Sequence, residues 1–187
     1  EPPSEGWIYA DSLIEDKKEI KRSILNGDYE SVVGKIIVSK DDVVYIPSGT
    51  LHALTRGSLV YEIQQSTDIT YRFFDYNRLD NDGKLRDLHL DDAIETLNTE
   101  NRVKSSAFPK DTLVSEQPYT MVRKTLENVY HNTTDVAVAI TVSKGSMCVD
   151  GHSILAGMSI LVLPDEAISI SQAAEEVVIA TPKLYFK

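Results

Sequence analysis

The stretch DDVVYIPSGTLHAL, residues 41–54, decides the fold of the first half of the chain. Its β-branched and aromatic residues favour a strand that stops at Pro47, because proline cannot donate to a sheet ladder. Gly49 permits a sharp turn, after which His52 leads into the next strand. A histidine placed after such a turn at the mouth of a small barrel points to a metal site, and a structural, partly buried histidine is the alternative.

Segments of the same composition on both sides of this turn predict a mainly β protein with a few helices. In the first half, strands are expected at 36–39, 43–47, 59–64 and 69–76. In the second half, they are expected at 119–130, 135–142, 146–149, 152–155, 159–163 and 176–181. Asp150-Gly151 predicts a hairpin turn. The spacing is typical of jelly-roll or sandwich barrels rather than of βαβ units.

Helices are expected at three places. Asp16 and Glu19 have the spacing of a capping box and predict a helix over 16–26, followed by a short helix at 28–33. The pattern at 88–98 predicts a third helix.

These elements suggest two β units. The first covers 1–100, with a helical insert at 16–33 and a bridging helix at 88–98. The second covers 101–187, and its charged start, 101–110, is expected to be a linker.

The charge and cysteine content limit the classes of function. The chain has 29 acidic and 19 basic residues and a net charge of −10, which argues against a nucleic-acid surface. A sugar phosphate remains possible, because one local arginine can bind it. The single cysteine, Cys148, excludes an intrachain disulfide and predicts a cytoplasmic protein, and no apolar run is long enough to cross a membrane. The oligomeric state stays open.

The second candidate site residue is Arg72, in ITYRFFDY, residues 69–76. An arginine in an apolar strand is costly unless it faces water or an anion. Asp68 and Asp75 are candidates to orient it, with turn or surface roles as the alternative. Glu62 and Gln64 alternate on one face of the preceding expected strand and are candidate substrate-binding residues, although an exposed edge strand would show the same pattern.

The segments IPSGTLHAL, EIQQSTDITYRFFDYNR and KLRDLHL together resemble class I, cupin-type mannose-6-phosphate isomerases in their short bacterial form. The resemblance implies a zinc-dependent enzyme that interconverts mannose 6-phosphate and fructose 6-phosphate through a cis-enediol. It implies that His52 is a zinc ligand and Arg72 the active-site arginine. Zinc would act as a Lewis acid, and Arg72 would stabilise the enediolate or hold the phosphate.

The chain departs from this family upstream. Further family ligands, a His or Gln pair and a Glu in a Lys-Thr-Glu segment, have no counterpart that we accept here. Glu5, two residues before Trp7, resembles a family Glu-x-Trp, but we match EGWIYAD to the strand that follows that segment. We therefore expect a chain that lacks the family's N-terminal part, binds zinc weakly and is inactive by itself.

The second unit is expected to be a metal-free, cupin-like domain, because GMSILVLP, residues 157–164, is followed by no histidine. His89, His131 and His152 are expected to be structural or exposed. The alternative to an isomerase is a non-catalytic cupin module that binds a sugar or sugar phosphate, and a purely structural cupin unit is a third possibility.

Overall fold

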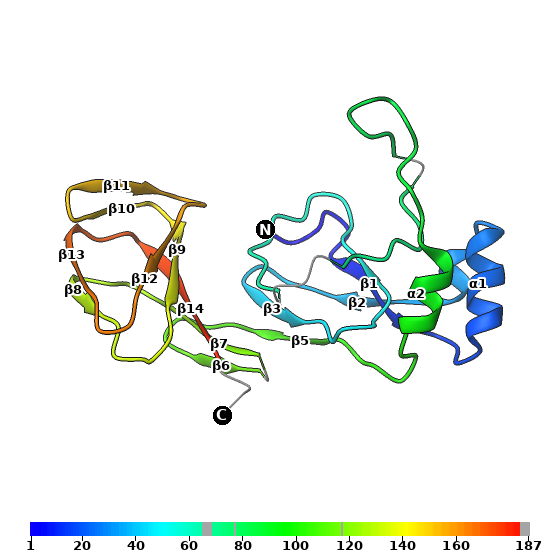
Figure 1. Ribbon diagram of the computed structural model, residues 1–187, viewed down its shortest axis with the longest axis horizontal. Helices are drawn as coiled ribbons and strands as arrows, with labels where there is room; N and C mark the ends of the chain where they lie inside the picture. The colour runs from blue at the N-terminus through cyan, green and yellow to red at the C-terminus, as the bar shows by residue number, and fades with distance from the viewer. Residues whose placement is uncertain (65–68, 77, 117, 184–187) are drawn as a thin grey trace. The chain divides into compact units, whose positions relative to one another are not determined.

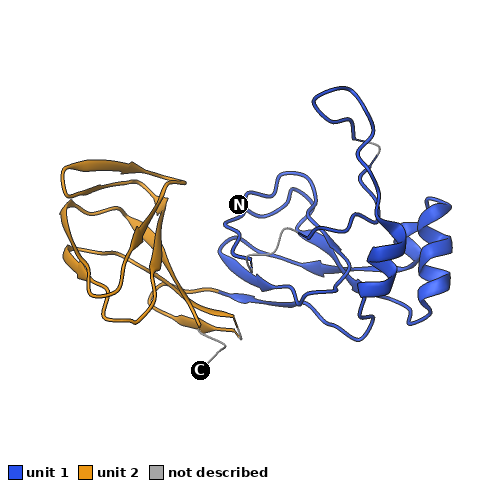
Figure 2. Cartoon of the chain, in the orientation of Figure 1, with its two compact units in different colours: residues 1–107 blue, residues 108–187 orange. Residues whose placement is uncertain are grey.

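The computed structural model describes residues 1–64, 69–76, 78–116 and 118–183. The chain divides into two compact units, 1–107 and 108–187 (Figure 2). The boundary lies after residue 107 rather than after residue 100, because strand β5 (Lys104–Ala107) pairs with β3 (Asp42–Tyr45). The prediction of a linker over 101–110 is therefore wrong for its central part.

Unit 1 contains two small antiparallel sheets (Figure 1). The larger has the order β2-β1-β4, in which β1 (Trp7–Ser12) lies between β2 (Val33–Ile37) and β4 (His52–Ala53). The smaller consists of β3 and β5. The strand expected at 43–47 begins one residue earlier and the strand expected at 36–39 begins three residues earlier, and both end two residues earlier than expected.

Two helices lie side by side in unit 1 (Figure 1). Helix α1 (Lys17–Leu25) begins at Asp16, whose side chain accepts hydrogen bonds from the first turn, and helix α2 is Leu90–Thr96. Both confirm the predictions, whereas the helix expected at 28–33 is one 3-10 turn, η1 (Tyr29–Ser31). The helices enclose an apolar cluster formed by Ile20, Ile24, Val32, Leu51 and Leu97.

The strands predicted at 59–64 and 69–76 are wrong, because the described residues of both segments form no strand. Residues 69–76 are held by side-chain packing instead of by pairing with another strand. Phe73 packs against the helix cluster, and the Phe74 ring stacks on Tyr29 at a centroid distance of 4.9 Å. Residues 78–86 of unit 1 then form a projecting loop (Figure 1), in which Leu79 and Leu85 make an isolated bridge.

Unit 2 is a jelly-roll sandwich. Its two sheets have the orders β12-β9-β14-β7-β6 and β11-β10-β13-β8. From β7 to β14, successive strands lie in alternate sheets except β10 and β11, which is the pattern of two Greek keys. The strands are β6 (Leu113–Ser115), β7 (Tyr119–Lys124), β8 (Asn128–His131), β9 (Val138–Lys144), β10 (Ser146–Val149), β11 (His152–Leu155), β12 (Ser159–Val162), β13 (Ala167–Gln172) and β14 (Glu176–Pro182).

Inward-facing residues of both sheets form the core of unit 2, with Val138, Ile140, Val142 and Val177 completely buried. The hairpin turn at Asp150-Gly151 is confirmed, since both residues have positive φ, 46° and 82°, between β10 and β11. The mainly β fold class is also confirmed. Strands β5, β6 and β13 had not been predicted. No described helix is long and apolar enough to span a bilayer.

Candidate functional site

A depression of about 580 Å³ opens on unit 1 beside β1 and the residues that follow β4. One wall is aromatic. Trp7 and Tyr9 lie two positions apart on β1 and so share a face of the strand, with ring centroids 4.8 Å apart. Tyr76 lines the depression from the later segment and packs edge-on against Phe74 at 5.0 Å. The depression therefore presents apolar ring surface to a ligand.

The Glu30 carboxylate lies beside this wall, and its charge is balanced by Lys35. The Tyr9 hydroxyl donates a 2.8 Å hydrogen bond to Glu30, and the Lys35 ammonium lies 3.1 Å from the same carboxylate oxygen. The hydrogen bond from Tyr9 and the contacts with Lys35 lower the pKa of Glu30. Burial, followed by the interaction with Glu30, raises the pKa of Tyr9. Lys35 also lies 4.2 Å from the centroid of the Trp7 ring, a cation–π contact.

Two arginines complete the lining. Arg56 follows β4, and Arg78 comes from the first arm of the projecting loop. Within the described residues neither guanidinium forms an ion pair, and both side chains are exposed to solvent. Glu5 brings a negative charge to the same depression, where it contributes, after burial, Tyr29 and Asp75, to raising the pKa of Tyr76. Ring surface beside two free guanidinium groups suits a carbohydrate that carries an anionic group.

The turn before His52 forms as predicted. Gly49 has φ 77°, and a Cβ there would lie 2.7 Å from the Thr96 carbonyl oxygen, so only glycine fits. The Thr50 hydroxyl donates to the Pro47 carbonyl at 2.6 Å. His52 begins β4 with an exposed side chain, and its Nδ1 lies 2.9 Å from the Thr50 carbonyl oxygen. His52 is not among the residues that line the depression.

Arg72 is half-buried and lies against the start of helix α2. Its backbone N–H points to His89 Nδ1 at 3.4 Å, and the His89 N–H donates to the Arg72 carbonyl at 2.9 Å. His89 thus has a structural role, as predicted. Glu62 and Gln64 are exposed, and neither they nor Arg72 line the depression. A cavity shared by His52 and Arg72 therefore stays a prediction.

The two acids expected near Arg72 have different outcomes. Asp75 forms an ion pair with Arg86 at 3.3 Å. Asp68 lies outside the described residues.

The described residues do not fit a zinc ion. Zinc sites need three or four close N, S or O ligands, and no three His, Cys, Asp or Glu side chains in the described ranges converge in that way. His52 by itself cannot hold the metal.

Apart from Glu5, which had been considered for its resemblance to a family Glu-x-Trp, the residues around the depression were missed because they come from separate parts of the sequence. The alternation of Trp7 and Tyr9 in GWIY, residues 6–9, was the available signal, since it places two large rings on one strand face. Nothing in the sequence pattern placed Arg56 and Arg78 beside them.

Comparisons with known proteins give a consistent set of relatives, although no protein-family model matches the chain. The chain is 46% identical over 81 residues to the probable mannose-6-phosphate isomerase GmuF of Bacillus subtilis. It is 42% identical over 81 residues to the mannose-6-phosphate isomerase of Streptococcus mutans. Each match covers 43% of this chain and 26% of the relative, so the matched stretch spans about a quarter of the relatives' length.

The comparison with solved structures also finds a mannose 6-phosphate isomerase. The crystal structure of the mannose 6-phosphate isomerase from Bacillus subtilis superposes with a TM-score of 0.69 and 25% identity, over 94% of this chain and 60% of that one. A structure from Archaeoglobus fulgidus, 15% identical with a TM-score of 0.60, supports the fold alone. The resemblance to mannose-6-phosphate isomerases that the sequence indicates is thus confirmed by relatives in sequence and in structure.

Proposed function

We propose that this chain serves in a mannose-6-phosphate isomerase, which interconverts mannose 6-phosphate and fructose 6-phosphate through a cis-enediol. The observation that carries the proposal is the 42–47% identity to proteins named mannose-6-phosphate isomerase, joined by the structural match. Because the chain covers 60% of the solved relative, the activity is proposed for a protein of the relatives' length.

The depression on unit 1 supplies groups that suit this substrate class. A sugar ring can pack its C–H face against Trp7 and Tyr76, while Arg56 and Arg78 attract the phosphate. Since the Glu30 carboxylate already has Tyr9 and Lys35 as partners, it repels the phosphate less than a free carboxylate would. We propose that the sugar phosphate binds here.

His52 and Arg72 remain proposed site residues of the complete enzyme. His52 would be one ligand of a zinc ion that polarises the sugar oxygens. Arg72 is always charged and would stabilise an enediolate or, in place of Arg56 and Arg78, hold the phosphate. Glu62 and Gln64 would contact the substrate where it extends beyond the depression, because none of these three residues lines it. Since the described residues assemble no zinc site, residues 1–187 by themselves are expected to be inactive. The single cysteine supports a cytoplasmic location.

A second candidate is a non-catalytic module that binds a sugar phosphate without metal. The observation in its favour is that the depression combines rings and guanidinium groups in a region where the described residues form no metal cluster.

An isomerase assay on the full-length protein separates the two functions. Formation of fructose 6-phosphate from mannose 6-phosphate is followed with and without a chelator, in the wild type and in His52→Ala. The enzyme proposal predicts that both treatments abolish turnover. Turnover that survives both would exclude the zinc role of His52, and binding without any turnover would favour the module.

A further inference from the structure

The projecting loop that carries Arg78 is an ordered hairpin. The Asp80 N–H donates to the Lys84 carbonyl at 2.7 Å, and the Gly83 N–H donates to the Asp80 carbonyl at 3.1 Å. Leu79 and Leu85 pair across its two arms. These contacts hold the two arms together, so that the base of the loop determines where Arg78 lies.

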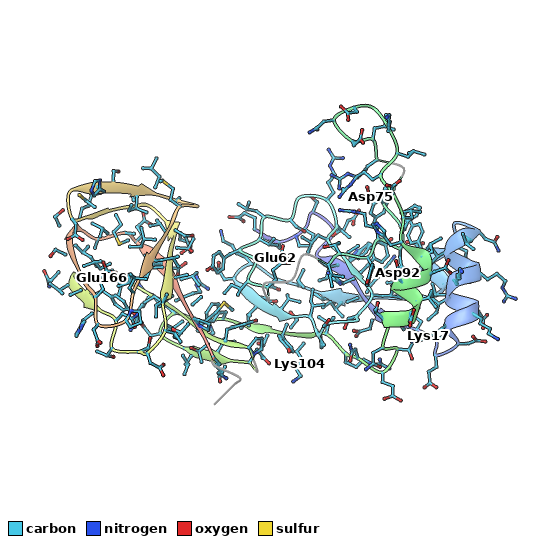
Figure 3. All side chains as sticks on the ribbon, in the orientation of Figure 1. Lys17, Glu62, Asp75, Asp92, Lys104 and Glu166 are labelled. Carbon is cyan, nitrogen blue, oxygen red and sulfur yellow. The ribbon has the colours of Figure 1, made fainter. Side chains whose placement is uncertain are left out.

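Asp75 holds both arms at that base, where Figure 3 labels it. On the first arm, the Arg78 N–H donates to the Asp75 carbonyl at 2.9 Å. On the second arm, Arg86 Nη1 lies 3.3 Å from Asp75 Oδ2. The Asp75 side chain is only 15% exposed, and its Oδ2 has no aligned hydrogen bond among the described residues. Arg86 is thus the ion-pair partner of a largely buried carboxylate. Removal of Arg86 would leave that buried charge unpaired, which is costly.

We propose that the Asp75–Arg86 pair is a clamp that positions Arg78 in the depression to take the anionic group of the ligand. The clamp fixes the backbone at both ends of the loop, so that less conformational freedom is lost when Arg78 binds an anion. Asp75 and Arg86 are positioning residues, because neither lines the depression. The inference rests on the proposed binding of a sugar phosphate there.

A binding titration tests the clamp. Trp7 is the only tryptophan and lines the depression, so its fluorescence reports occupancy. We expect Arg86→Gln and Arg78→Gln each to weaken the binding of mannose 6-phosphate about tenfold, the effect of one lost charge-assisted hydrogen bond. Arg86→Lys should restore most of the affinity. The binding of mannose, which lacks the phosphate, should be unchanged in all three variants.

The double variant separates positioning from a general structural role. Because Arg86 is proposed to act through Arg78, Arg78→Gln/Arg86→Gln should bind mannose 6-phosphate no more weakly than Arg78→Gln alone. Additive losses, or an equal loss of mannose binding, would overturn the clamp. Arg22→Gln, on the exposed side of α1, is the matched control and should change neither titration.

A second readout needs no ligand. The order parameter of the Arg78 backbone N–H group, measured by NMR relaxation, should fall in Arg86→Gln and in Asp75→Asn. An unchanged order parameter would overturn the clamp. If the wild type shows that order but binds no mannose 6-phosphate, the proposed function fails while the positioning of Arg78 stands.

Discussion

The hydroxyl of Tyr9 donates a 2.8 Å hydrogen bond to the Glu30 carboxylate and so joins strand β1 to the 3-10 turn η1. Tyr9 is only 8% exposed, although it stands on the wall of an open depression. The bond therefore fixes the ring wall, while the Lys35 ammonium, 3.1 Å from the same oxygen, balances the charge of Glu30.

Removal of this hydroxyl should weaken unit 1. Tyr9→Phe should lower the free energy of unfolding by about 1 kcal/mol, because the hydrogen bond is lost while the ring remains. Urea unfolding followed by Trp7 fluorescence measures the change. Tyr61→Phe, at a ring that is 42% exposed, is the matched control. Equal stability of the two variants would show that the bond contributes nothing.

The turn before His52 should require glycine for steric as well as conformational reasons. Gly27 and Gly49 both have φ 77°, but only at Gly49 would a Cβ meet a backbone atom, the Thr96 oxygen at 2.7 Å. Gly27→Ala should therefore cost about 1 kcal/mol, the usual penalty of a left-handed residue. Gly49→Ala should cost clearly more and shift the His52 resonances in an NMR spectrum. Equal costs would contradict the close approach.

The stability of unit 2 should fall in acid because of Glu176. Burial raises the pKa of Glu176, but the hydrogen bonds from Arg123, at 2.7 Å, and Ser143 outweigh it, so the pKa lies below the ordinary 4.5. A lowered folded pKa means that this stabilisation is present above pH 4.5 and is lost as the pH falls through the folded value.

Amide hydrogen exchange in β9 and β14 measures this effect. The opening free energy of these strands should decrease below pH 4.5 in the wild type and decrease less in Glu176→Gln. The same acid dependence in both proteins would assign it to other carboxylates.

Zinc should bind the 187-residue chain only weakly, because a tight site needs several preassembled ligands and the described residues offer His52 without a cluster. After incubation with zinc and gel filtration, elemental analysis should find far less than one equivalent. His52→Ala should behave in the same way. Retention of a full equivalent that His52→Ala loses would show that the site is complete.

Much of unit 2 could be predicted from the sequence, because alternating apolar residues and the Asp150-Gly151 turn determine strands and hairpin locally. The segments 59–64 and 69–76 show the limit of that reasoning. Their composition favours strands, yet β-propensity depends on a neighbouring strand, and Phe73 and Phe74 find partners in the helix cluster and in Tyr29 instead.

The turn at His52 was predicted, whereas the depression was not. Trp7, Arg56 and Arg78 meet only through the β1–β4 pairing and the position of the projecting loop. Such long-range placement leaves no mark on local periodicity. The depression could therefore be found only in the folded chain.

The most direct measurement of the central claim is a crystal structure of this chain with mannose 6-phosphate. The sugar ring is predicted to lie against Trp7, with its phosphate between the guanidinium groups of Arg56 and Arg78. A sugar phosphate bound elsewhere, with the depression filled by solvent alone, would contradict the account.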